Sequence, residues 1–95
     1  MAKNPIIPDL GMSDEQFELW MADTEEELDR CSGHPHTEII KYFKFSHLKP
    51  ELRDVSMGFA LLVLGLLDTL PPVPERTVAF RKILEAKDAA VRSML

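Results

Sequence analysis

Aromatic and basic side chains interleave through residues 41–53, and this mixture could bind a nucleotide. Aromatic rings stack on nucleobases, and cations bind phosphate groups. A structural interpretation competes with this one, because Phe43 continues the apolar helical spacing of Ile39 and Ile40. Phe45 could serve either purpose. The members of this cluster are Tyr42, Phe43, Phe45, Lys41, Lys44, His47, Lys49 and Arg53.

A second group of polar side chains lies where Arg76, Thr77 and Arg81 follow the start of a predicted helix. The first backbone N–H groups of a helix have no partner within it, so they favour anions. The competing interpretation is local. Arg76 could form an ion pair with Glu75 or Asp68, and Thr77 could hydrogen-bond only to nearby backbone.

Catalytic motifs are missing from the sequence. It has no nucleophile motif, phosphate loop or paired-histidine helix motif, so we predict that the protein is not an enzyme. Cys31, His34 and His36 lie close together, with His47 further on, but their spacing fits no standard set of zinc ligands. We therefore predict neither a metal site nor a cofactor.

Charge and hydropathy exclude two further classes. Of the net charge of −5, residues 1–30 contribute −7 and the other residues +2, which argues against binding to polymeric nucleic acid. The longest apolar run, residues 57–67, is shorter than the roughly 20 residues of a membrane span. With one cysteine and no apolar signal region, we expect a cytoplasmic protein that does not enter the membrane.

The first half of the chain predicts an extended arm over residues 1–12 and a helix that begins after Ser13. Ser13 and Gln16 have the spacing of a capping box. Thr24 and Glu27 have the same spacing, so this helix could break near residue 23. Thr37 is expected to cap a short helix that ends near residue 46. Residues 13–95 are predicted to form a single helical domain.

The second half predicts a pair of long antiparallel helices. Residues 50–70 carry leucine and valine at helical spacing, and Leu61 and Leu64 add apolar side chains outside that face. A chain of 95 residues has little surface with which to cover such a helix, so we predict a homo-oligomer held through it. Gly58 and Gly65 would allow a close helix approach. A proline-rich turn leads into a helix over about residues 75–94, and no strand pattern is present, so the predicted class is all-α.

Several blocks of sequence resemble a family of small phage-encoded helical proteins, and this resemblance covers roughly residues 36–92. The family is in turn similar to the phage anti-CBASS sponge proteins. The blocks are Phe43, Phe45, His47–Leu48, Leu52–Arg53, Ser56, Leu70–Pro71, Pro74–Ala79, Arg81–Lys82 and Leu84–Arg92.

The resemblance implies a function and a set of site residues. Sponge proteins are small helical hexamers that sequester cyclic di- and trinucleotide immune messengers without reacting with them, inside the infected bacterium. By this resemblance, ligands bind between protomers, Phe45 stacks on a base and Thr77 donates a hydrogen bond. The expected phosphate ligands are Lys49, Arg53 and Arg76, and His47 would orient the loop.

The acidic helix over residues 13–30 supports an alternative function, because the resemblance does not include it. This helix could dock on a host protein, while the other helices only oligomerise. Trp20 separates the two hypotheses. An exposed Trp20 would be an interface anchor, whereas a Trp20 buried on its own chain would make the helix a structural cover.

Overall fold

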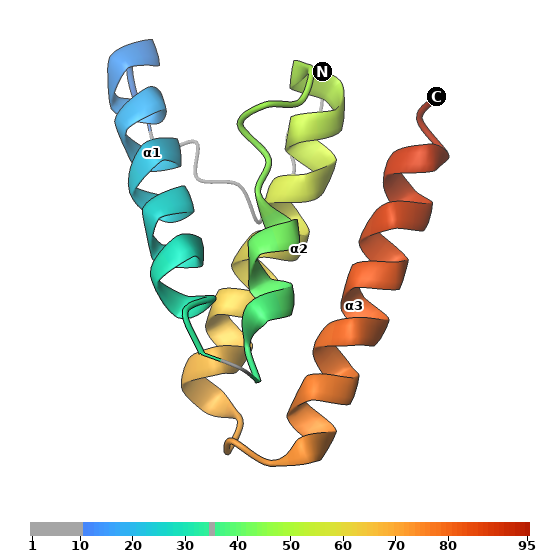
Figure 1. Ribbon diagram of the computed structural model, residues 1–95. Helices are drawn as coiled ribbons and strands as arrows, with labels where there is room; N and C mark the ends of the chain where they lie inside the picture. The colour runs from blue at the N-terminus through green and yellow to red at the C-terminus, as the bar shows by residue number, and fades with distance from the viewer. Residues whose placement is uncertain (1–10, 35) are drawn as a thin grey trace.

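Four helical segments make up the computed structural model, which describes residues 11–34 and 36–95 (Figure 1). They are α1 (Asp14–Cys31), the 3-10 helix η1 (Glu38–Phe43), α2 (Pro50–Thr69) and α3 (Pro74–Arg92). Within the described ranges there is no strand, which confirms the all-α prediction. Most of the predicted arm, residues 1–10, lies outside the described residues. No helix in the described part of the chain has the length and apolarity needed to cross a membrane.

Helix α1 begins where its sequence predicts. The Ser13 hydroxyl accepts a hydrogen bond from the Gln16 backbone N–H at 3.1 Å, and the Gln16 side chain accepts one from the Ser13 N–H at 2.9 Å. The possible break near residue 23 is wrong, because α1 continues to Cys31. The Thr24 hydroxyl donates to the Trp20 carbonyl at 2.8 Å instead of capping a new helix.

The short helix η1 is the centre of the fold, because it contacts all three long helices. Its side chains Ile40 and Phe43 are fully buried. Two expectations about it are wrong: it ends at Phe43 rather than near residue 46, and Thr37 makes no side-chain cap. The Thr37 hydroxyl donates instead to the Cys31 carbonyl at 2.6 Å, which ties η1 to the end of α1.

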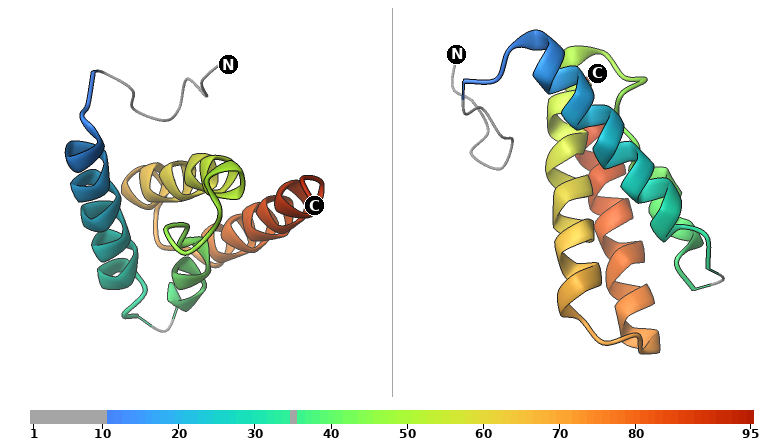
Figure 2. Two further views of the ribbon diagram at one scale, coloured as in Figure 1. Left: turned by 90° about the horizontal axis from the view of Figure 1, so that it is seen from above. Right: turned by 90° about the vertical axis from the view of Figure 1, so that its left-hand side faces the viewer.

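Helices α2 and α3 form a hairpin joined by a short turn (Figure 1). Each begins with a proline, Pro50 and Pro74, whose missing N–H costs nothing in the first turn of a helix. The front view and the view from above show that α1 and α3 lie on opposite sides of η1 and α2 (Figures 1 and 2). The buried core contains Met21, Leu28, Ile40, Phe43, Phe45, Met57, Ala60, Val63 and Phe80.

Candidate functional site

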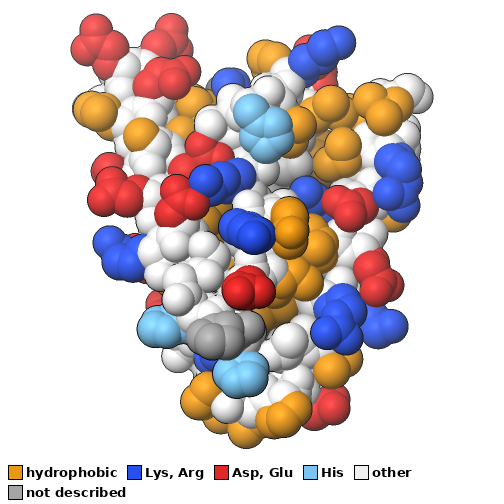
Figure 3. Space-filling view, in the orientation of Figure 1, with side chains coloured by type: hydrophobic (Ala, Val, Ile, Leu, Met, Phe, Trp, Pro, Cys, Tyr) orange, Lys and Arg blue, Asp and Glu red, His pale blue; other side chains and the backbone are white. Residues whose placement is uncertain are grey.

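A groove of about 580 Å³ separates η1 and its following loop from the C-terminal half of α3. Its apolar residues are Leu48, Leu84 and Val91, and its other lining residues are Lys41, Tyr42, Lys44, His47, Lys87, Asp88 and Arg92. The space-filling view shows basic and histidine side chains bordering hydrophobic ones on this face (Figure 3). The groove therefore combines an apolar surface with a mostly cationic border.

One wall of the groove presents an exposed aromatic ring. Tyr42 is 55% exposed, and the Lys41 ammonium lies 5.3 Å from the centre of its ring. Such a ring can take a flat aromatic ligand on its surface, with the neighbouring cation close enough to meet an attached anion. Tyr42 is thus the aromatic residue of the basic cluster that can stack on a ligand from the groove.

The two walls are held together by Lys87. Its ammonium donates to the Tyr42 carbonyl at 2.9 Å and lies 3.4 Å from the Asp88 carboxylate. The Lys87 side chain is only 13% exposed, whereas that of Asp88 is 48% exposed. Lys87 therefore fixes the distance between α3 and the end of η1, and Asp88 remains available as a hydrogen-bond acceptor in the groove.

The predicted stacking role of Phe45 needs correction. Phe45 is 0% exposed and packs beside Trp20, with the two ring centres 6.4 Å apart. Helix α1 covers this ring, so a ligand in the groove has no access to it. Trp20 itself is half-buried, stacks on Phe17 at 5.9 Å and packs against the core.

His47, Lys49 and Arg53 lie in different surroundings. His47 is exposed and lines the groove. Lys49 is exposed at the residue before α2, where its carbonyl accepts a hydrogen bond from the Arg53 N–H, but it does not line the groove. The Arg53 guanidinium lies 5.6 Å from the ring centre of Phe17, and its Nε is buried with no hydrogen-bond partner in the described structure.

Arg76 and Thr77 lie at the other end of α3 from the groove. An α-helix rises about 1.5 Å per residue, so Arg76 is roughly 16 Å along the axis from Lys87. Arg76 donates to the Leu70 carbonyl at 3.4 Å and lies over the Phe80 ring. The Thr77 hydroxyl donates to the His36 carbonyl at 3.5 Å. A single chain therefore does not bring the six predicted site residues together.

Several residues of the groove were not predicted as site residues. Lys41, Tyr42 and Lys44 belong to the basic cluster, and α3 contributes Lys87 and Arg92 from the other wall. The spacing of residues 84, 87, 88 and 91 places them on one helical face, which could have signalled a shared surface. Sequence spacing does not show, however, that this face lies opposite η1.

Metal ligands do not gather anywhere in the described ranges: no three His, Cys, Asp or Glu side chains lie close enough to share an ion. Cys31 instead donates to a Glu27 carboxylate oxygen at 3.8 Å. In comparisons with known proteins, no family model, curated protein or solved structure matched this chain.

Proposed function

We propose that this protein binds a cyclic di- or trinucleotide and sequesters it without reaction, as an anti-CBASS sponge does in the cytoplasm of an infected bacterium. The observation that carries the proposal is the groove between η1 and α3. It offers an exposed aromatic ring, an apolar surface and several cations in one place. A nucleotide needs the same three features, for its base, its sugar and its phosphates.

The size and charge of the groove suit a ligand of this class. Its volume of about 580 Å³ falls within the roughly 300–1,000 Å³ typical of small-molecule sites. In the proposed complex a base stacks on Tyr42, and Lys41 and Arg92 bind phosphate oxygens. Asp88 accepts a hydrogen bond from a base amine or a ribose hydroxyl. His47 keeps its predicted place beside the ligand.

The proposal includes a homo-oligomer held through α2, which is a hexamer by resemblance. The exposed surface of α2 supports it, because Leu62 is 47% exposed and the space beside Gly65 is open. Four predicted site residues lie outside the groove, and in the proposed oligomer they would contact the ligand between protomers. Phosphate would bind to Lys49, Arg53 and Arg76, and a hydrogen bond would come from Thr77.

Calorimetric titration with a panel of cyclic di- and trinucleotides tests the function. We expect the wild type to bind at least one of them and Tyr42→Ala to raise its Kd about tenfold, since base stacking contributes about 1–3 kcal/mol. Lys82→Ala is the matched control, because Lys82 is exposed on α3 but does not line the groove. The proposal fails if no cyclic nucleotide binds at micromolar protein, or if both variants lose affinity equally.

A second candidate function is docking of α1 on a host protein. Leu19 supports it, because this side chain is 65% exposed beside the carboxylates of Asp14, Glu15 and Glu18. Trp20 does not serve as the anchor, since it packs against the core of its own chain. Under this hypothesis Leu19→Asp abolishes binding to a host protein and leaves nucleotide binding unchanged. If Leu19→Asp binds nucleotide as tightly as the wild type and no host protein associates with either of them in infected cells, this hypothesis is rejected.

A further inference from the structure

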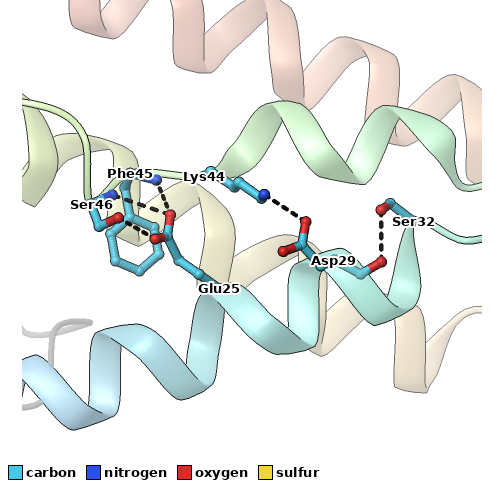
Figure 4. A network of polar contacts seen from close by, with 6 residues as sticks. All are labelled: Glu25, Asp29, Ser32, Lys44, Phe45 and Ser46. Carbon is cyan, nitrogen blue, oxygen red and sulfur yellow. Dashed lines mark hydrogen bonds and ion pairs between the residues drawn. The ribbon is translucent and has the colours of Figure 1, made fainter.

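Hydrogen-bond donors converge on one point in the loop between η1 and α2. The backbone N–H groups of Phe45 and Ser46 donate to the same carboxylate oxygen of Glu25, at 2.9 and 3.2 Å. The Ser46 hydroxyl donates to the other oxygen. Figure 4 shows the Glu25 side chain reaching from α1 to these three donors.

A second carboxylate of α1 meets the cation of the same loop. The Lys44 ammonium lies 2.6 Å from an Asp29 carboxylate oxygen. Asp29 follows Glu25 by one helical turn, so both carboxylates project from the same face of α1 toward residues 44–46 (Figure 4). The carboxylates of Glu25 and Asp29 thus accept hydrogen bonds from both backbone N–H groups, from the Ser46 hydroxyl and from the Lys44 ammonium.

The donor set is typical of a site for phosphate. Two successive backbone N–H groups that share one acceptor can bind a phosphate oxygen, and the hydroxyl and the ammonium beside them can donate further hydrogen bonds to the same anion. Burial alone raises the pKa of Glu25, but the hydrogen bonds from Ser46 and Phe45 lower it overall. Hydrogen bonding to Asp29 likewise raises the pKa of Lys44. The segment therefore stabilises negative charge.

We infer that residues 44–46 form an anion-binding site for a phosphate group, and that α1 occupies this site with the carboxylates of Glu25 and Asp29. A phosphate that displaces them gains the same donors. The site adjoins the groove, because Lys44 and the following residues His47 and Leu48 line it. The inference depends on the proposed function only for the identity of the natural ligand, which would place one phosphate here.

Titration with inorganic phosphate tests the site in the full-length chain. The readouts are the backbone amide resonances of Phe45 and Ser46. In the wild type the carboxylate competes, so binding is weak. Glu25→Ala removes the competitor. If the carboxylate fills the site nine-tenths of the time, its removal lowers the apparent Kd about tenfold. Glu26→Ala is the control, since Glu26 is exposed on the same helix.

A second variant tests the site in case Glu25→Ala disturbs the packing of α1. Glu25→Gln combined with Asp29→Asn keeps the size of both side chains and removes their charge, and it should also bind phosphate more tightly than the wild type. Adding Lys44→Ala should reverse this gain. The inference is overturned if folded Glu25→Ala and the double variant both show no saturable shift of these two amides, or if Glu26→Ala gains equally.

The same titrations separate this inference from the proposed function. Phosphate binding by Glu25→Ala, with no cyclic nucleotide bound by any variant, would reject the proposed function and support the anion site. Cyclic nucleotide binding that is unchanged in Glu25→Ala, with no phosphate shift, would reject the anion site and support the proposed function. Phosphate competing with the cyclic nucleotide at the Ser46 amide would support both.

Discussion

At the scale of single residues, the ring that the resemblance assigns to stacking, Phe45, is buried, whereas Tyr42, for which no role was predicted, is exposed. Phe45 is enclosed by α1, and Tyr42 is exposed in the groove. The two aromatics lie three residues apart in one basic cluster, and helical spacing does not extend past residue 43. The burial of Phe45 depends on α1, about 20 residues earlier in the chain, and local sequence patterns do not reveal this contact.

The difference in burial predicts that alanine has a large effect on stability at Phe45 and a small one at Tyr42. Phe45→Ala should lower the free energy of unfolding by about 3–5 kcal/mol, because it leaves a cavity in the core. Tyr42→Ala should change it by no more than about 0.5 kcal/mol, as is usual for an exposed side chain. Urea unfolding measures both. A Phe45→Ala variant as stable as the wild type would show that α1 does not cover this ring in solution.

At the scale of elements, the helices that local signals define were predicted well. A capping box starts α1, and prolines start α2 and α3 at residues 50 and 74. The predicted break near residue 23 was wrong, because Thr24 and Glu27 have the spacing of a capping pair but lie within a continuous helix. The predicted end of η1 was also wrong, because Lys44 has an extended backbone and the next two N–H groups donate to Glu25 of α1 instead of continuing the helix.

The contact between α3 and η1 predicts a specific loss of stability. Lys87→Met keeps an apolar chain of similar length but removes the hydrogen bond to the Tyr42 carbonyl. We expect the free energy of unfolding to fall by about 1 kcal/mol, as for a typical intramolecular hydrogen bond. Thermal unfolding followed by circular dichroism measures this. Lys82→Met is the control on the same helix, and an equal loss there would contradict the role of Lys87.

At the scale of the whole molecule, the candidate site was predicted only in part. His47 lies in the groove, while Arg76 and Thr77 lie at the opposite end of α3. Two clusters of suitable residues were visible in the sequence, but their separation follows from the length of α3 and the direction of the hairpin. Contacts between protomers, which we propose through α2, would decide whether the two clusters serve one ligand.

The proposed assembly predicts a change of mass on a single substitution. Wild-type protein should be larger than a monomer by light scattering, and Leu62→Glu should reduce it to a smaller species that keeps its helical content. Leu19→Glu is a matched control, because Leu19 is also exposed but lies on α1. A wild type that stays monomeric at high concentration would reject assembly through α2.

The central position of η1 has a consequence for how this chain can vary. The six residues of this 3-10 helix contact all three long helices, so a shift of α1, α2 or α3 relative to η1 disturbs the same short stretch. Exposed positions that lie outside the groove and outside the proposed α2 interface are free to change independently of one another. Ile40 and Phe43 are the fully buried side chains of this helix, so a substitution at either position disturbs the segment that all three long helices contact.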